Sequence, residues 1–163
     1  MHSRAFSSAL GSAAFVLMCA ATVPVYAQTD EARAGARSLA TEGATAFSDG
    51  RFKDAVELFS KAESLVHAPP HLLFIARAST KLGQFVKARE AYEKAIALDA
   101  AYASPVLNLG ILNDLYLQDR KRALALYDQY LALSGGDAAV TKWVADLKNR
   151  KDDHVALSMK ERP

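Results

Sequence analysis

The sequence predicts an all-α protein built from stacked helix-turn-helix units, and internal repetition is the main reason. Two segments, 50–62 and 83–95, carry glycine, phenylalanine, alanine, an aromatic residue and alanine at identical offsets, and their central alanines lie 33 residues apart. A looser third copy at 119–130 places its alanine, Ala123, another 35 residues on, but lacks the glycine. A repeat of this length is one supersecondary unit, and such units stack to bury a shared core.

The residues within each repeat have the spacing of one face of a helix. Ala55, Phe59 and Ala62 stand at positions i, i+4 and i+7, and the second repeat keeps the same residue classes at the same spacing. Small residues let two helix backbones approach closely, and the ring between them fills the remaining space. Upstream of each stripe we predict a partner helix with a large and a small residue, namely Leu39 and Gly43, Leu72 and Ala76, and Val106 and Gly110.

These residues resemble the tetratricopeptide repeat family. The signature Gly-x-Phe-x-x-Ala-x-x-x-aromatic-x-x-Ala occurs twice, and the matching region runs from Arg37 to Ser134. The resemblance implies a right-handed superhelical stack of about three repeats followed by a C-terminal capping helix. An unrelated antiparallel helix bundle is the alternative. The sequence departs from the family where an aromatic residue usually opens the first helix and where a proline usually closes the repeat, at Leu39, Leu72, Val106, His67, Ala100 and Ser134.

Prolines, glycines and changes in composition mark the expected boundaries. Pro69 and Pro70 separate the first two repeats, and Pro105 suits the first turn of a helix in the third. Beyond the third repeat we expect a capping helix with Trp143 as its anchor. The predicted segments are a cleavable signal peptide at 1–27, an N-terminal lead-in at 28–36, repeats at 37–68, 69–101 and 102–135, a capping helix at 136–152 and a disordered tail at 153–163.

The N-terminus has the features of a secretory signal. Arg4 precedes the uncharged residues 5–21, and Ala27 supplies the small residue that signal peptidase requires before the cleaved bond. We therefore predict an exported protein, periplasmic or extracellular, with no membrane span after cleavage. One alternative is that the apolar run stays as a membrane anchor. Another is lipidation of Cys19, although Met18 before it fits a lipobox poorly.

Composition and motif content argue against catalysis and against nucleic acid as a partner. The formal net charge is +2, with acidic and basic residues interspersed, so no large field of one sign is expected. The chain has no phosphate-binding glycine loop, zinc-protease helix motif or serine elbow. Prolines prevent His67 and His71 from sharing a helical face, so we interpret both as exposed turn residues. We expect no metal, no cofactor and no enzymatic activity.

In the family that this chain resembles, the first helices of successive repeats line a concave face on which peptides dock. Arg77 and Lys81 stand one helical turn apart on that face and suit an acidic group of a partner. The basic and asparagine residues with which some members clamp a chaperone's C-terminal carboxylate are mostly missing here. The candidate groove residues are Phe47, Leu73, Arg77, Lys81, Leu107, Asn108, Ile111 and Asp114.

The resulting hypothesis is a non-catalytic adaptor outside the cytoplasm that binds a protein or peptide through its concave face. The alternative is a structural accessory subunit of an exported enzyme or of an envelope or secretion complex, bound through the convex face or the capping helix. The identity of the partner and the oligomeric state do not follow from the sequence.

Overall fold

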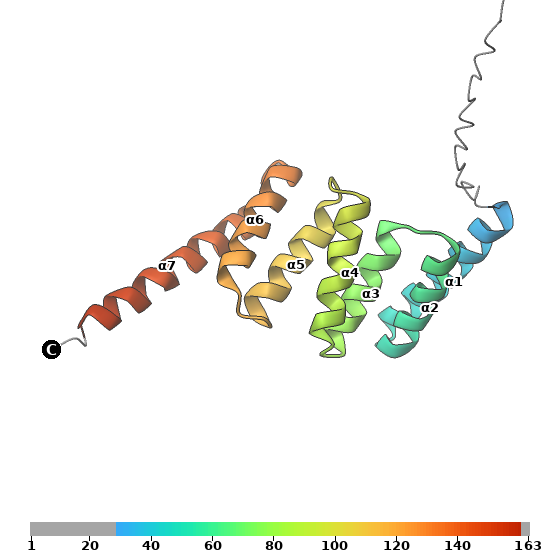
Figure 1. Cartoon of the computed structure of the whole chain (residues 1–163), viewed down its shortest axis with the longest axis horizontal. Coiled ribbons are helices and arrows are strands. Elements are labelled where there is room, and N and C mark those ends of the chain that lie inside the picture. The colour runs from blue at the N-terminus through green and yellow to red at the C-terminus, as the bar shows by residue number, and fades with distance from the viewer. Residues whose placement is uncertain (1–28, 161–163) are drawn as a thin grey trace, which may run out of the picture.

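The fold was obtained as a computed structural model that describes the backbone of residues 29–160 and the side chains of residues 29–149. This part of the chain forms seven helices and no strand, which confirms the all-α fold class (Figure 1). The helices are α1 (Asp30–Ser48), α2 (Phe52–Leu65), α3 (Pro69–Lys81), α4 (Phe85–Leu98), α5 (Ala103–Leu115), α6 (Arg120–Ser134) and α7 (Ala138–Lys160).

The helices form three successive hairpins, α1 with α2, α3 with α4, and α5 with α6, and each hairpin packs on the next (Figure 1). Ala55, Ala88 and Ala123 are fully buried at equivalent places in the second helix of each hairpin. The aromatic ring that follows each alanine by one turn is also buried. The repeating stripe read from the sequence is therefore the surface along which the hairpins pack.

The small residues of the first helices lie where the aromatic rings press against the backbone. A Cβ atom on Gly43 would lie 2.9 Å from ring carbons of Phe59, and one on Gly110 would lie 2.7 Å from the ring of Tyr127. Real Cβ atoms do not approach carbon that closely. Glycine at these two positions therefore lets α1 lie close to α2 within the first hairpin, and α5 close to α6 within the third.

The turns inside the three hairpins share a left-handed backbone conformation. Gly50 and Gly83 have φ angles of 76° and 72°, and Gln118 takes the same place in the third hairpin with a φ of 55°. Glycine adopts this region without steric cost, whereas a side chain is disfavoured there. The third repeat therefore keeps the geometry of the turn although it has lost the glycine.

Two predicted boundaries differ from the structure. Helix α1 begins at Asp30, inside the predicted lead-in at 28–36, because Thr29 Oγ1 accepts a hydrogen bond from the Ala32 N–H at 3.1 Å and caps it. Helix α7 runs to Lys160, so the tail predicted to be disordered from residue 153 is helical up to that point. No glycine or proline follows Gly136 until Pro163, and charge density alone does not end a helix.

Among residues 29–149 the core consists of two clusters. The larger one extends from Ala46 in the first hairpin to Leu126 in the third. The second cluster joins α6 to α7 and contains Ala123, Tyr127, Val140, Val144 and Leu147. Helix α7 thus covers the last hairpin.

Trp143, which we predicted to be the anchor of the capping helix, is not part of the buried stripe of α7. Its side chain is 40% exposed, whereas Val140, Val144 and Leu147 are buried. These three residues are spaced i, i+4 and i+7, so they form the buried stripe and leave Trp143 at its edge. The Trp143 ring still lies against Tyr127, with 6.0 Å between the ring centroids.

No helix in the described part of the chain is both long enough and apolar enough to cross a bilayer. The predicted signal peptide and Cys19 lie outside the described residues, as do residues 161–163 at the C-terminus.

Candidate partner-binding groove

A hollow of about 420 Å³ lies between the first helices of the three hairpins, on the face that we predicted to be concave. We call it the concave groove. It brings together five of the eight candidate residues, Phe47 from α1, Arg77 and Lys81 from α3, and Asn108 and Ile111 from α5. Thr80, Tyr92, Leu112 and Tyr116 complete its lining.

Aromatic rings hold the cationic end of Arg77 in the concave groove. The guanidinium carbon lies 5.0 Å from the centroid of the Phe47 ring and 5.4 Å from that of Phe74. The two rings meet edge to face at 5.6 Å, so their positions are fixed relative to each other. No carboxylate among residues 29–149 forms an ion pair with Arg77 or with the exposed Lys81. The groove therefore offers two cations to an incoming ligand.

The other groove residues are mostly apolar or weakly polar. Asn108 Nδ2 donates a hydrogen bond to the Ser104 carbonyl at 2.7 Å, which leaves its side-chain oxygen for a ligand. Tyr116 is 47% exposed, and its ring lies tilted against that of Phe85, with 4.8 Å between the ring centroids. Burial raises the pKa of Tyr92 to about 12, so its phenol stays neutral and can act as a hydrogen-bond donor.

Three candidate residues do not line the concave groove. Leu73 is only 6% exposed, because α3 lies between neighbouring helices and that side of it belongs to the larger core cluster. Leu107 is half-buried against the second core cluster. Asp114 lies in a separate hollow of about 310 Å³ between α5 and α7, which we call the α5–α7 pocket. Sequence reasoning missed Tyr116, because it follows the last residue of α5 and stands outside the helical pattern.

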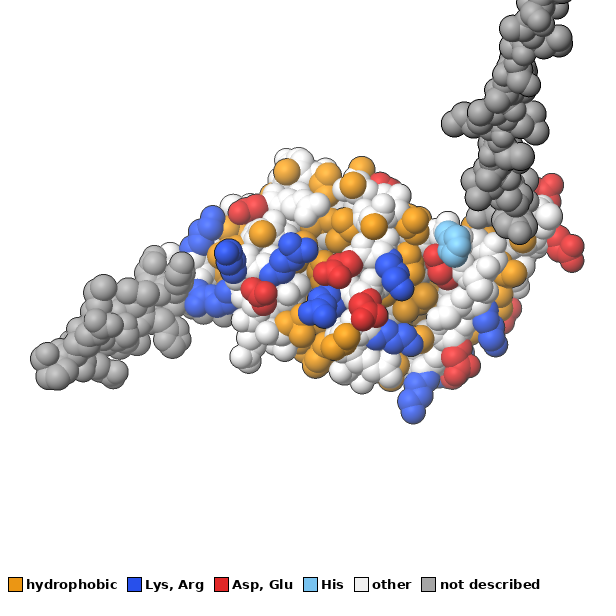
Figure 2. All heavy atoms as spheres, in the orientation of Figure 1, with side chains coloured by type: hydrophobic (Ala, Val, Ile, Leu, Met, Phe, Trp, Pro, Cys, Tyr) orange, Lys and Arg blue, Asp and Glu red, His pale blue; other side chains and the backbone are white. Residues whose placement is uncertain are grey.

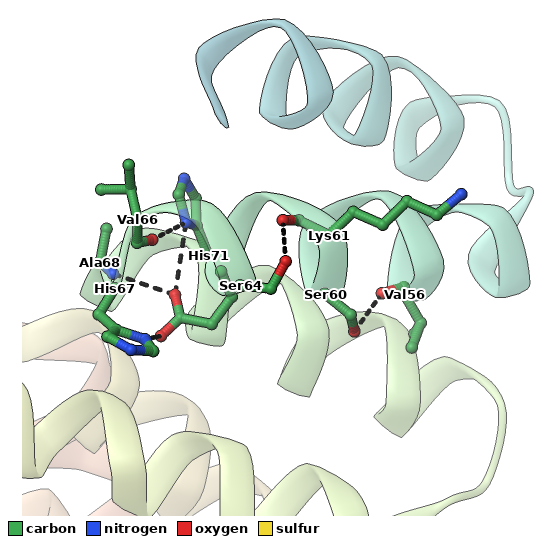
Figure 3. Close-up of polar contacts among 9 residues, drawn as sticks. Val56, Ser60, Lys61, Ser64, Val66, His67, Ala68 and His71 are labelled. Carbon is green, nitrogen blue, oxygen red and sulfur yellow. Dashed lines mark hydrogen bonds and ion pairs between the residues drawn. The ribbon is translucent and has the colours of Figure 1, made fainter. Parts of the chain in front are cut away.

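The two histidines near the prolines meet at Glu63 (Figure 3). Glu63 Oε1 lies 3.0 Å from His67 Nδ1, and Glu63 Oε2 accepts a hydrogen bond from the Ala68 N–H at 3.0 Å. His71 is buried, contrary to our expectation of an exposed turn residue, and its Nδ1 lies 3.1 Å from the Val66 carbonyl oxygen. This cluster ties the end of α2 to the start of α3. Within residues 29–149, no three potential ligands are arranged to hold a metal.

The outer face over α4 has a different character. Figure 2 shows Lys and Arg side chains alternating there with Asp and Glu, with apolar patches between them. Lys87, Arg89, Glu90, Glu93 and Lys94 are the exposed charged residues of α4. This face carries charges of both signs, whereas Arg77 and Lys81 are the charged residues in the lining of the concave groove.

No protein-family model matches the sequence, and a search of curated proteins finds no match. Solved structures do match. The Sgt2 TPR domain from Aspergillus fumigatus is 26% identical with a TM-score of 0.68, and the similarity covers 83% of this chain and 87% of that one. The first TPR of Spaghetti (RPAP3), bound to an HSP90 peptide, has 21% identity and a TM-score of 0.69 over 74% of this chain and 95% of its own.

The Yersinia enterocolitica type III secretion chaperone SycD, in complex with a peptide of the translocator YopD, is 15% identical with a TM-score of 0.66, over 71% of this chain and 93% of that one. These similarities confirm the resemblance inferred from the repeats: the chain has the tetratricopeptide repeat fold.

Proposed function

We propose that this chain is a non-catalytic interaction module that binds a peptide or protein partner through the concave groove. The observation that carries the proposal is the convergence of side chains from three successive repeats on one hollow, whose lining includes two cations that form no ion pair within residues 29–149. Similar folds in RPAP3 and SycD were solved with bound peptides, which supports the same use of the fold here. The mixture of aromatic, cationic and amide groups suits an extended segment with at least one acidic group.

A peptide-display selection tests the groove. Peptides selected on the protein are measured against a variant with Arg77→Ala and Lys81→Ala, and we expect about a tenfold loss of affinity or more, because hydrogen bonds to charged groups each contribute about 1.5–3 kcal/mol. The matched control carries Lys87→Ala and Arg89→Ala, which remove the same charge from exposed positions on α4.

The two variants separate the proposal from its alternative. Equal binding by the groove variant and the wild type would contradict binding through the concave face. A loss confined to the α4 variant would favour the accessory subunit, bound through the outer face over α4.

We also propose that the protein acts outside the cytoplasm, on the strength of Arg4, the uncharged run at 5–21 and the small residue Ala27. Expression of the whole sequence in a bacterial host followed by fractionation and N-terminal sequencing tests this. The expected product is periplasmic and begins at Gln28. A cytoplasmic product that begins at Met1 would contradict export.

A further inference from the structure

The α5–α7 pocket combines aromatic walls with two acidic side chains. Ile111 and Leu115 from α5, Tyr127 from α6 and Trp143 from α7 supply its apolar lining. The Tyr127 and Trp143 rings meet at an angle of 57°, so they form two adjoining walls rather than a stack. Leu115 is 64% exposed and Trp143 is 40% exposed, which leaves apolar surface open at the mouth of the pocket.

The carboxylates of the pocket come from opposite sides, Asp114 on α5 and Asp146 on α7. The Tyr127 hydroxyl lies 3.3 Å from Asp114 Oδ2 and donates to it, so that carboxylate is held beside the ring. No cation among residues 29–149 forms an ion pair with either aspartate. The pocket therefore places two carboxylates beside the partly exposed aromatic ring of Trp143, whereas the Tyr127 ring is buried.

A ligand that fits these walls needs a positive charge and an apolar stem. Aromatic faces attract cations, and the attraction adds to that of a nearby carboxylate. Lysine and arginine carry such a charge at the end of a chain of methylene groups that can lie along apolar surface. An acidic or neutral side chain would bring no positive charge to the two carboxylates.

We propose that the α5–α7 pocket receives a lysine or arginine side chain of the peptide that lies in the concave groove. This inference rests on the proposed function and adds the chemistry of the partner to it. Ile111 lines both the concave groove and the pocket, so one extended segment can occupy the two in succession. With Arg77 and Lys81 at one end and Asp114 and Asp146 at the other, the charges fix the direction of the bound segment.

Trp143 provides a direct test, since it is the only tryptophan of the chain. Its fluorescence is followed during titration with three capped pentapeptides that have alanine at four positions and lysine, norleucine or glutamate at the centre. The lysine peptide is expected to change the fluorescence in the millimolar range, as suits a single side chain in a pocket. The norleucine peptide is expected to bind about fivefold more weakly, because it keeps the stem and lacks the charge.

Two variants locate the binding site. Asp146→Asn is expected to weaken the lysine peptide about fivefold without affecting the norleucine peptide, because it removes a charge and preserves the shape of the side chain. The control, Asp128→Asn, removes a charge from an exposed position of α6 outside the pocket and is expected to change nothing. Circular dichroism melts of both variants check that the fold is retained.

Several results would overturn the inference. These are the absence of any fluorescence change with the lysine peptide, equal binding of lysine and norleucine peptides, or equal binding by Asp146→Asn and the wild type. Saturation by free tetramethylammonium with no response to the lysine peptide would assign the pocket to a small cation instead.

The display selection separates the inference from the proposed function. Selected peptides that need Arg77 and Lys81 but contain no recurring basic residue would support binding in the concave groove and contradict a basic side chain in the α5–α7 pocket. A response of Trp143 to the lysine peptide, with no effect of the groove variant on selected peptides, would support a basic side chain in the pocket and contradict binding in the groove.

Discussion

Gly110 shows how one missing methyl group sets the packing of a hairpin. A Cβ at this position would meet two ring carbons of Tyr127 at 2.7 and 2.8 Å and the Cβ of Leu126 at 3.4 Å. Tyr127 is fully buried, so the ring has little room to move. We predict that Gly110→Ala lowers the free energy of unfolding by about 1–3 kcal/mol, the usual cost of overpacking a core. Urea denaturation followed by circular dichroism measures it.

Gly35 is the matched control for that substitution. It also lies within a helix, but an added Cβ would meet only the end of the Leu65 side chain, at 3.3 Å, and Leu65 is exposed and can move. Gly35→Ala is therefore expected to be neutral or to stabilise the protein by up to about 1 kcal/mol, from helix propensity. Equal stability of the two variants would contradict the role assigned to Gly110.

Gln118 holds the left-handed turn that glycine holds in the other two repeats. Its φ of 55° costs about 1–2 kcal/mol for a residue with a side chain, and glycine avoids this steric cost. Part of that stabilisation is lost, because glycine also has more conformational freedom in the unfolded chain. We predict that Gln118→Gly raises the free energy of unfolding by up to about 1 kcal/mol. Gly83→Ala, at a φ of 72°, is expected to lower it. A thermal melt in which Gln118→Gly is the less stable protein would refute this.

At the scale of the helix, Asp137 connects α6 to α7. Its Oδ1 accepts hydrogen bonds from the N–H groups of Ala139 at 2.9 Å and Val140 at 3.2 Å, and its Oδ2 accepts one from the Tyr130 hydroxyl at 3.1 Å. These hydrogen bonds lower the pKa of Asp137, and the one from the Val140 N–H has a larger effect than the one from the Tyr130 hydroxyl. The ionised carboxylate therefore stabilises the folded state.

The sign of this shift predicts how the docking of α7 depends on pH. A lowered pKa gives stability that is present above the pKa of the unfolded chain, about 4 for aspartate, and is lost as the pH falls through the folded value. We predict that, at a urea concentration just below the unfolding midpoint, Trp143 fluorescence shows the detachment of α7 from the last hairpin below about pH 4. In Asp137→Asn this acid transition should be reduced and the docking weaker at neutral pH. An identical acid transition in the variant would assign it to other carboxyl groups.

The helices show which parts of the fold could be predicted from sequence and which could not. Stripes such as Ala88, Tyr92 and Ala95 are periodic, so the hairpins and their register were predicted correctly. The start of α1 was missed because it depends on the cap at Thr29, and the end of α7 was missed because no helix breaker stands before Lys160. Neither feature is part of the repeating pattern.

The sequence pattern identified five of the eight candidate residues as lining the concave groove, and the others lie elsewhere because periodicity does not show how much of a helix is covered by its neighbours. A helix in the middle of a stack exposes only a narrow strip, and Leu73 is buried although Arg77, one turn further along α3, is partly exposed. The α5–α7 pocket could not be predicted, because Trp143 and Asp146 reach Asp114 only when α7 packs on the last hairpin.

For the whole molecule, the division of the core into two clusters determines how the protein should unfold. In a stack, each hairpin contacts only its neighbours, so stability is close to a sum of local terms. The larger cluster joins all three hairpins, whereas α7 is held by the second cluster and by the Arg120 guanidinium, which donates to the Leu147 carbonyl. Helix α7 is therefore expected to detach before the hairpins separate.

Leu147 is the residue that tests this order of events. It is 1% exposed within the second cluster, so Leu147→Ala should cost about 2–5 kcal/mol, and that cost falls on the docking of α7. We predict that the urea midpoint seen by Trp143 fluorescence then falls well below the midpoint seen by far-ultraviolet circular dichroism, which reports all the helices. Leu109→Ala, in the larger cluster, should lower the circular dichroism midpoint instead. Coincident midpoints in Leu147→Ala would mean that the stack and its cap unfold as one unit.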